Sequence, residues 1–330
     1  MAKIDVAVPC YNYGRFLEAC VRSVLEQSVT DLRVLIIDDA STDDTLSVAT
    51  ALAQEDGRVS VIAHAQNQGH IRTYNEGIAW ATADYFLLLS ADDLLLPGAL
   101  ERATRILDEH LDIVLAHGDC PIWRDTLPSP DCTQNYTWER QDLIKESCVS
   151  GDTVVYTATA VVRTETQKRI GGYLETLPHC ADLEMWLRFA LNGGVARIGA
   201  PQALYRIHSS AMSRTNKVTT FGSRQRQAAF AVFFDRYEQA ARESSQVALS
   251  GRAKFLRAQA HKAVAQLTFR AGIDHLRRGR VAAGLEFFHL AMDQYPPLRF
   301  CPPFWLLFRI PGPEGRRWAA SRLLSFFMRN

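Results

Sequence analysis

The chain has 330 residues, of which 47% are hydrophobic and 22% are charged. That composition is typical of a globular protein and excludes a disordered chain, and the length suggests about two domains of roughly 150 residues each. The 37 basic and 36 acidic residues leave a formal net charge of +1. Because the chain has no overall basic field, nucleic acid is not expected as its main partner.

The first 117 residues alternate short apolar runs with helical patterns. The runs predict buried strands and the stretches between them predict helices, with Ser41 and Asp44 as a capping box and Pro97 in the first turn of the fourth helix. This alternation predicts a mostly parallel α/β sheet covered by helices on both faces. The expected strands are 4–9, 33–37, 59–63, 85–89 and 113–117, and the expected helices are 15–27, 41–53, 71–82 and 97–110.

Beyond residue 117 the alternation loosens. Residues 118–181 predict long loops with one or two strands, at 154–158 and 160–163. An amphipathic pattern over 182–192 predicts a helix that ends at a pair of glycines. Residues 217–296 are rich in helix-forming residues at a 3.6 period, which predicts a helical extension.

The last segment, residues 299–330, interleaves aromatic and aliphatic residues with six arginines, and Glu314 is its one acidic residue. Two interpretations stay open. The segment forms either a helix in a membrane interface or a terminal helix that packs on its own domain with the arginines outward.

Targeting signals and cysteine usage indicate the cellular compartment in which a protein works. The N-terminus carries no hydrophobic region of a signal peptide, and no apolar run reaches the roughly 18 residues that span a bilayer. The seven cysteines are scattered and form no CxxC pair. That pattern argues against a disulfide framework or a zinc site and favours free thiols in a reducing compartment. We therefore expect a cytoplasmic protein, in peripheral contact with the inner face of the cytoplasmic membrane if the tail is interfacial.

Pairs of carboxylates stand at the ends of two predicted strands, Asp38-Asp39 and Asp92-Asp93. Adjacent carboxylates repel each other and lose solvation, so they are more easily tolerated beside a cation or a hydrogen-bond donor. Such pairs are usual ligands of Mg²⁺ and Mn²⁺, which also bind phosphate oxygens. Helix capping is the simpler interpretation, and we favour it for Ser41 and for Asp43-Asp44. For Asp93 we favour a metal.

Two further positions are candidates for chemistry. His208 is flanked by Tyr205, Arg206 and several serines, and a neutral imidazole can complete an oxygen-rich metal shell. Asp182 and Glu184 begin a predicted helix, where the helix dipole stabilises an ionised carboxylate. That position is either purely structural or suited to a general base, and spacing alone leaves both open.

Taken together, five segments in this order and spacing resemble family 2 glycosyltransferases of the GT-A fold. They match the family's opening strand and helix, its second strand and acidic turn, its Asn-x-Gly segment leading to the metal motif, its acceptor-side helix and its late histidine. The segments are 6–27, 33–45, 67–93, 170–190 and 205–213.

The resemblance implies a role for each matching residue. The uridine pocket would be lined by Pro9, Tyr11 and Asn12, with Asp39 accepting a hydrogen bond from the base and Arg72 near the nucleotide. Asp92 would face the ribose, and Asp93 would bind a Mn²⁺ or Mg²⁺ ion that bridges the diphosphate. His208 would approach the same metal or the diphosphate. Asp182 would be the catalytic base, with Glu184 as the alternative.

The resemblance also implies an activity. It is that of an inverting, hexosyltransferase-type enzyme that moves a sugar from a nucleotide-diphosphate donor, with a UDP-sugar favoured. The acceptor would be a hydroxyl of a saccharide or lipid-linked molecule, in cell-surface polysaccharide biosynthesis of the cell envelope. The GT-A domain would cover residues 1–216 and divide into a nucleotide-sugar half (1–117) and an acceptor half (118–216). The helical extension would cover residues 217–330.

The sequence departs from the family pattern at two positions. Ser90 stands where the metal motif usually begins with Asp, and Ala181 stands where Glu commonly precedes the base. Two other classes of function remain: a catalytically silent scaffold, and a sugar nucleotidyltransferase. The latter would need a glycine-rich, basic phosphate loop after the first strand, where this chain has PCYNYGR. A dinucleotide dehydrogenase is remote because its glycine fingerprint is missing.

Overall fold

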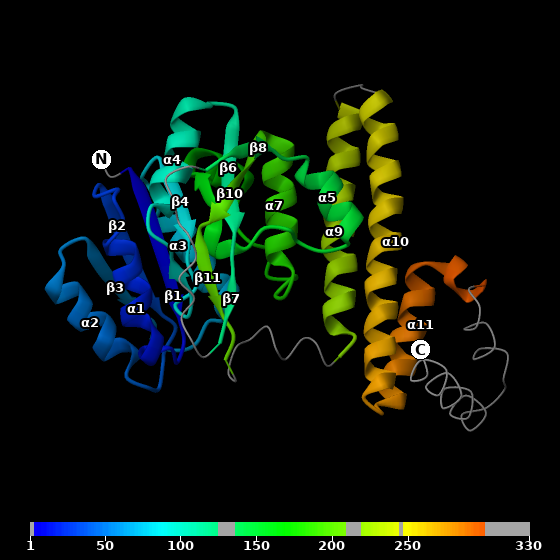
Figure 1. Cartoon of the computed structure of the whole chain (residues 1–330), viewed down its shortest axis with the longest axis horizontal. Helices are drawn as coiled ribbons and strands as arrows, with labels where there is room; N and C mark the ends of the chain where they lie inside the picture. Colours follow the sequence, from blue (N-terminus) through cyan, green and yellow to red (C-terminus); the bar gives the residue numbers. More distant parts are fainter. Residues whose placement is uncertain (1–2, 125–135, 209–218, 244–246, 301–330) are drawn as a thin grey trace. The chain divides into compact units, whose positions relative to one another are not determined.

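The computed structural model describes residues 3–124, 136–208, 219–243 and 247–300. The chain separates into two compact units (Figure 1). The first unit comprises residues 1–143 and 153–211, and the second comprises 144–152 and 212–330. The domain boundary expected at 216 lies outside the described residues and stays a prediction.

An eight-stranded sheet forms the centre of the first unit, in the order β3-β2-β1-β4-β9-β6-β10-β8. A small three-stranded sheet, β5-β11-β7, accompanies it. The strands of the large sheet are β1 (Ile4–Cys10), β2 (Leu32–Asp38), β3 (Val59–Ala63), β4 (Tyr85–Leu88), β6 (Ile113–Asp119), β8 (Trp138–Arg140), β9 (Val161–Arg163) and β10 (Gly194–Pro201), and those of the small sheet are β5 (Leu94–Leu95), β7 (Ile122–Trp123) and β11 (Ala203–Arg206).

Strands β3, β2, β1 and β4 are parallel, as the alternation of strands and helices predicts. Strand β9 then pairs antiparallel with both β4 and β6, and β10 runs parallel to β6. The carboxyl ends of β1, β2, β4 and β6 therefore lie at one edge of the sheet, where ligands bind in open α/β folds.

Helices cover both faces of this sheet. Leu17 and Val21 of α1, Ala49 of α2 and Leu100 of α4 belong to the hydrophobic cluster on one face. On the other face α3 comes so close that a Cβ added at Gly77 would lie 2.6 Å from the Cβ of Ala7. The helices of this unit are α1 (Gly14–Leu25), α2 (Thr45–Glu55), α3 (His70–Trp80), α4 (Ala99–Glu109), α6 (Thr164–Ile170) and α7 (Ala181–Asn192), with a short 3₁₀ turn η1 (Thr157–Thr159).

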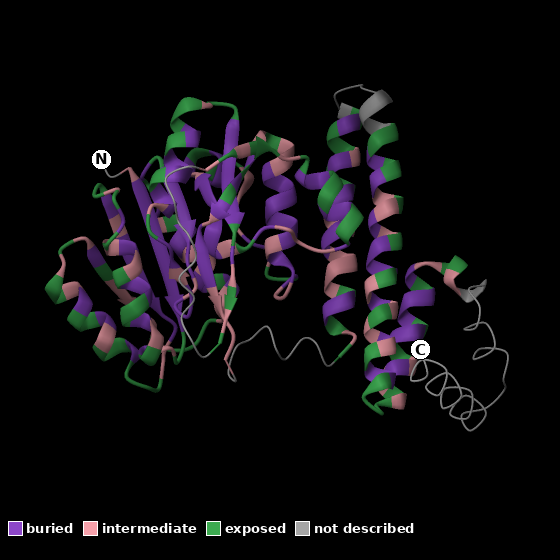
Figure 2. Ribbon diagram, in the orientation of Figure 1, coloured by how far each residue is buried: buried purple, intermediate pink, exposed green. Residues whose placement is uncertain are grey.

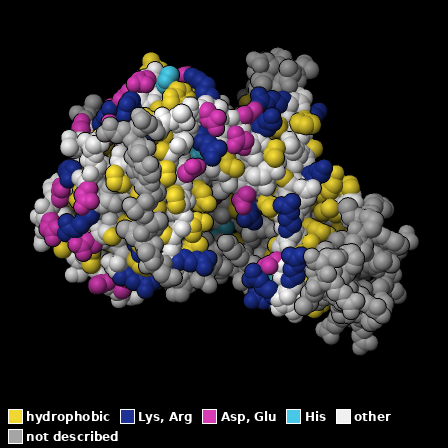
Figure 3. All heavy atoms as spheres, viewed as in Figure 1, with side chains coloured by type: hydrophobic (Ala, Val, Ile, Leu, Met, Phe, Trp, Pro, Cys, Tyr) yellow, Lys and Arg dark blue, Asp and Glu magenta, His cyan; other side chains and the backbone are white. Residues whose placement is uncertain are grey.

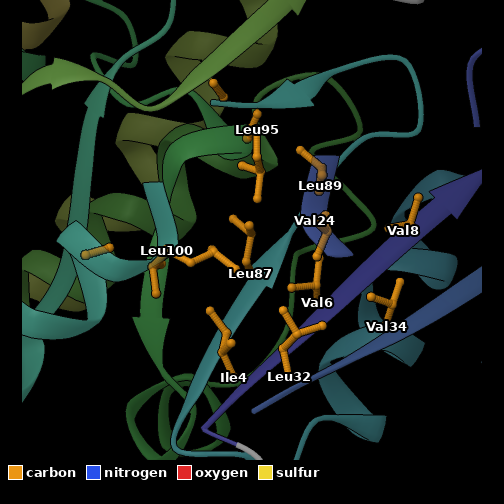
Figure 4. Close-up of a cluster of buried hydrophobic side chains, with 14 of the residues drawn as sticks. Ile4, Val6, Val8, Val24, Leu32, Val34, Leu87, Leu89, Leu95 and Leu100 are labelled. Atoms are coloured by element: carbon orange, nitrogen blue, oxygen red, sulfur yellow. The ribbon is translucent and has the colours of Figure 1, made fainter. Parts of the chain in front are cut away.

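The core consists of aliphatic side chains from strands and helices that lie apart in the sequence. Figure 4 shows Val6 of β1, Val34 of β2 and Leu87 of β4 directed into one cluster with Leu100. In Figure 2 the strands of the sheet are almost wholly buried, whereas the helices expose one side. The expected fold class, a helix-covered α/β sheet with a helical extension, is present.

Three local predictions are wrong: the starts of two helices and one strand. Helix α2 begins at Thr45, and the side chain of Ser41 accepts a hydrogen bond from the Asn12 amide in place of capping the helix. Helix α4 begins at Ala99, after Gly98 adopts a left-handed conformation, so Pro97 precedes it. Residues 154–158 form no strand, since the chain enters η1 there.

The second unit is helical. Helices α10 and α11 cross where two glycines meet: a Cβ added at Gly284 would lie 2.8 Å from Cδ2 of Leu276 and 3.0 Å from the carbonyl oxygen of Gly272. The helices of this unit are α5 (Leu143–Ser150), α9 (Phe221–Glu243), α10 (Val247–Arg277), α11 (Val281–Gln294) and the 3₁₀ helix η2 (Pro296–Phe300). The helical extension expected over 217–296 thus matches α9 to α11. The tail from 301 lies outside the described residues.

Candidate active site

The loops after β1 and β2 are bound to each other by a set of short hydrogen bonds. The Asn12 amide donates to Ser41 Oγ at 2.9 Å, and the Asn12 side-chain oxygen accepts from the Thr42 amide at 2.8 Å. The Tyr13 amide donates to Thr45 Oγ1 at 3.0 Å. Asn12 and Ala40 both have φ near +60°. For alanine this left-handed conformation costs about 1–2 kcal/mol, and such strain gathers at functional sites.

Asp39 follows β2 and is almost completely buried. Its Oδ1 accepts hydrogen bonds from the Gln68 amide at 2.7 Å and from His64 Nδ1 at 2.7 Å, and its Oδ2 accepts from the Gly69 amide at 2.9 Å. Burial alone raises the pKa of Asp39, but these bonds outweigh burial and hold the pKa below its usual value. Asp39 is therefore an ionised carboxylate with a fixed orientation.

Asp92 and Asp93 lie beside His208, although 116 residues separate Asp92 from His208 in the sequence. The loop after β4 supplies both carboxylates, and β11 leads directly into His208, whose Nε2 lies 3.0 Å from Asp92 Oδ2. The Arg206 amide donates to Asp93 Oδ1 at 3.0 Å. Burial and the neighbouring carboxylate of Asp92 raise the pKa of Asp93 well above its usual range. A cation at this position would relieve that unfavourable charge.

Aromatic rings surround this carboxylate pair. The His208 ring lies 4.8 Å from Phe16 and 5.6 Å from Tyr13, measured between centroids. The guanidinium of Arg206 packs between Phe16 and Trp123, 4.5 and 4.0 Å from the ring centroids, and its Nε donates to the Asp92 carbonyl at 2.9 Å. These rings limit access of water and so strengthen electrostatic interactions at the carboxylates.

Asp182 lies in the first turn of α7, where its Oδ1 accepts a hydrogen bond from the Leu183 amide at 2.8 Å. The buried phenol of Tyr74 has a pKa raised by burial, by Asp92 and by Asp182. Tyr74 is thus close enough to both carboxylates to be affected by each.

Glu184, the alternative base, is fully buried and forms an ion pair with Arg188, whose Nε lies 2.8 Å from Glu184 Oε2. Arg188 also donates to the carbonyls of Ile170 and Gly172. This network fixes the loop that precedes α7. A structural role therefore accounts for Glu184.

The other predicted nucleotide residues are placed less uniformly. Pro9 is buried within β1 opposite Ile37, whereas the Tyr11 ring is 46% exposed beside the same loop. Arg72 lies on α3 with its Nε 3.1 Å from Glu175 Oε2, and both side chains are exposed. The structure thus brings His208 into contact with Asp92, the chain neighbour of Asp93, and it turns Arg72 toward a surface ion pair.

The donor atoms at Asp93 suit a divalent cation that the protein would hold only in part. Within the described residues no group of three His, Cys, Asp or Glu side chains is arranged as a ligand set. Mg²⁺ is commonly bound by one or two carboxylates and completes its shell with water and substrate phosphate oxygens. Asp93, with the adjoining Asp92 and His208, offers the hard oxygen and imidazole donors for such an ion.

Sequence reasoning missed four residues of this region: His64, Tyr13, Tyr74 and Arg206. The sequence offers one signal for Tyr74, its spacing of four residues from His70, which puts the two side chains on one face of a helix. In the structure their rings are in contact. The position of Arg206 depends on a contact with Asp92, 114 residues away in the sequence, and no local pattern marks it.

Two solved structures share this fold. The 1–349 portion of TarS from S. aureus in complex with UDP-GlcNAc has a TM-score of 0.57 at 17% identity, over 89% of this chain and 91% of that chain. A mannosyltransferase from Pyrobaculum calidifontis in complex with GDP-Man and Mn²⁺ has a TM-score of 0.56 at 16% identity, over 92% and 82%. At such identities the likeness concerns the fold alone, and it confirms the GT-A class.

Residues 5–153 match the family model described as Glycosyl transferase family 2. An uncharacterized glycosyltransferase of Nostoc is 36% identical over 121 residues, which cover 34% of this chain and 37% of the relative. Glycosyltransferase GlyG of Streptococcus pneumoniae is 29% identical over 115 residues, covering 34% and 38%. The match therefore spans little more than a third of these relatives. Residues 5–153 are thus similar to family 2 glycosyltransferases, as the sequence motifs predict.

Proposed function

We propose that the protein is an inverting glycosyltransferase that moves a sugar from a UDP-sugar onto a hydroxyl group. The observation that carries the proposal is the grouping of Asp92, Asp93 and His208 in the same unit as the fixed carboxylate of Asp39 and the helix-start carboxylate of Asp182. The similarity to family 2 glycosyltransferases and the nucleotide-sugar complexes of structures with this fold support the same function.

The hydrogen bonds at Asp39 favour uracil over guanine. A carboxylate accepts about four hydrogen bonds, and three donors already occupy Asp39. One acceptor position is left, which suits the single ring N–H of uracil. Guanine presents an N–H and an amino group side by side, and a carboxylate with one remaining position would leave one of these donors unpaired, at a cost of about 1–3 kcal/mol.

In the proposed reaction Asp182 takes the proton of the acceptor hydroxyl as its oxygen attacks the anomeric carbon. The Leu183 amide donates to this carboxylate in the first turn of α7, where a helix dipole favours the charged form that a general base requires. Attack opposite to the diphosphate inverts the anomeric centre in one displacement. A divalent cation held by Asp93 with His208 would neutralise charge on the departing diphosphate.

We further propose a saccharide or lipid-linked acceptor in cell-surface polysaccharide biosynthesis, with peripheral contact between residues 299–330 and a membrane. Charge supports the contact. After residue 218 there are 18 of the 37 basic residues and 7 of the 36 acidic residues, which gives this part a formal charge of +11. The first 218 residues carry the remaining 19 basic and 29 acidic residues, a formal charge of −10. In the described part of the chain no helix is both long and apolar enough to cross a membrane.

A donor screen tests the proposal. The purified protein would be mixed with UDP-, GDP-, dTDP- and CMP-sugars, with Mn²⁺ or with EDTA, and followed by its melting temperature and by nucleotide release. We expect a metal-dependent stabilisation and slow release of nucleotide with a UDP-sugar. Stabilisation without product, even when saccharide acceptors are supplied, would support the silent scaffold, and no response to any nucleotide sugar would reject the proposal.

A further inference from the structure

The imidazole of His64 lies between two carboxylates in the first unit. Its Nδ1 is 2.7 Å from Asp39 Oδ1 and its Nε2 is 2.6 Å from Glu76 Oε2. The His64 ring and Asp39 are about 5% exposed, whereas Glu76 is 37% exposed. His64 follows β3, Asp39 follows β2 and Glu76 is on α3, so the ring joins three elements.

Two contacts of this length require hydrogen on both ring nitrogens, because an ionised carboxylate only accepts. A neutral imidazole carries one N–H, whereas the imidazolium carries two. Burial alone lowers the pKa of His64, but the hydrogen bonds to Asp39 and Glu76 outweigh burial and raise the pKa above 6.5. The third nearby carboxylate, Asp38, accepts a hydrogen bond from the Ser41 amide.

Loss of the proton would affect the two carboxylates differently. Glu76 is partly exposed and can rotate into water. Asp39 is held by the amides of Gln68 and Gly69 and cannot move away without breaking those bonds. A neutral ring with its hydrogen on Nε2 would place the lone pair of Nδ1 against the Asp39 carboxylate. A neutral ring with its hydrogen on Nδ1 would keep the bond to Asp39 but lose the hydrogen bond to Glu76. Either change alters the field at the oxygens of Asp39.

We propose that His64, protonated and supported by Glu76, is a positioning residue that fixes the carboxylate of Asp39 for the nucleobase and makes donor affinity depend on pH. This inference rests on the proposed function, because it takes Asp39 as the group that meets the base. It adds two residues, His64 and Glu76, to the recognition of the nucleotide. Donor affinity is then highest with His64 charged and falls as rising pH removes that proton.

The test measures UDP binding by calorimetry in the presence of Mn²⁺, from about pH 7 to about pH 8.5, where the phosphate ionisation near about pH 6 no longer contributes. Three variants are compared with the wild type. Glu76→Gln removes one of the two carboxylates that hold the proton. His64→Asn keeps a donor toward Asp39 but has no titratable ring. Glu55→Gln removes a surface carboxylate, paired with Arg22, and serves as the matched control.

We expect the wild type and Glu55→Gln to lose UDP affinity together as the pH rises. In Glu76→Gln the same loss occurs about one pH unit lower, because one opposite charge is gone. His64→Asn binds UDP more weakly at about pH 7, by about threefold to tenfold, because its neutral amide makes a weaker hydrogen bond to Asp39 than the charged ring does, and its affinity changes little above that pH. An unshifted profile in Glu76→Gln, or a wild-type profile in His64→Asn, would overturn the proposal.

Histidine NMR separates this inference from the proposed function. In the absence of nucleotide, the His64 ring is expected to titrate above about pH 6.5 in the wild type and at lower pH in Glu76→Gln. Because the raised pKa stabilises the fold only while the ring is charged, the melting-temperature difference between these proteins should be largest near about pH 6 and shrink at higher pH. If UDP does not bind although His64 titrates in this way, the proposed function fails and the ion triad stands. A titration at or below about pH 6.5 in the wild type overturns the triad itself.

Discussion

At the scale of single residues, Asp39 serves the fold and, in the proposed function, also the donor site. Asp39 fixes residues 64–69 through His64 and two backbone amides, and those bonds are also what keep it ionised and oriented. The sequence places Asp39, Asp92 and Asp93 correctly at strand ends because strands are visible in the hydrophobic pattern. It misses His64 and Arg206 because their roles come from contacts between distant segments.

The role of Asp182 is open to direct measurement. We expect Asp182→Asn to lower turnover by about 10²-fold or more, since the amide cannot accept the acceptor proton, with little change in donor affinity. Steady-state kinetics with a UDP-sugar and calorimetry with UDP give the two quantities. The Asn side chain still accepts the Leu183 amide, so α7 should be retained. Unchanged turnover would remove Asp182 from the mechanism.

Asp5 has a role in stability. It is fully buried in β1 and accepts hydrogen bonds from Arg33 and from the amides of Thr82 and Ala83. Asp5→Ala removes the acceptor of two backbone amides and of the half-exposed Arg33, and we expect it to lower the free energy of unfolding by about 1–3 kcal/mol in a urea titration. The exposed Asp84 provides the control, with a change of about 0.5 kcal/mol or less expected for Asp84→Ala. Equal effects would show that the network contributes little.

At the scale of elements, strands and helices of the first 117 residues are predicted well because each carries its own periodicity. Their starts are predicted less well, since Ser41 is occupied by the Asn12 amide and Gly98 sets the beginning of α4. Strand β9 has three residues and is recognised only as part of a short apolar run. Its place between β4 and β6 follows from long-range pairing, which a local pattern does not encode.

The crossing of α10 and α11 leads to a prediction at this scale. A methyl group at Gly284 would meet Leu276 and the Gly272 carbonyl. We therefore expect Gly284→Ala to destabilise the protein by about 1–3 kcal/mol through overpacking. On α10 a Cβ at the exposed Gly251 meets nothing within 4 Å, so Gly251→Ala should stabilise the protein by about 0.5–1 kcal/mol. Thermal unfolding of both variants checks the sign of each effect, and a stabilised Gly284→Ala would contradict the close crossing.

At the scale of the whole molecule, charge is divided along the chain although the total is close to zero. In Figure 3 the side chains of Lys and Arg spread over the helical unit. Lys254, Lys262 and Arg270 are exposed on α10. A surface of this sign attracts anionic lipid, and salt weakens the attraction when the charges are exposed.

We expect the full-length protein to sediment with vesicles that contain anionic lipid, to bind neutral vesicles weakly, and to be released as salt is raised. Removal of residues 299–330 should abolish most of the binding, because that segment supplies the apolar side chains. If the shortened protein keeps the melting temperature of the full-length protein, it is folded, and a second truncation is not needed as a control. Absence of binding by the full-length protein would exclude the membrane contact at the first step.

The position of β9 also has a consequence for the order in which the molecule is made. Strands β1 to β4 can pair as soon as residue 88 has left the ribosome, but β6 reaches them only through β9, which is synthesised later. Until residue 163 emerges, the edges of β4 and β6 have no partner strand, and unpaired edges are prone to aggregation. We expect nascent chains halted before that residue to be cut readily by protease around β6, and chains halted well beyond it to resist. The three residues of β9 would thus determine when the growing chain can pair the edges of β4 and β6 and avoid aggregation.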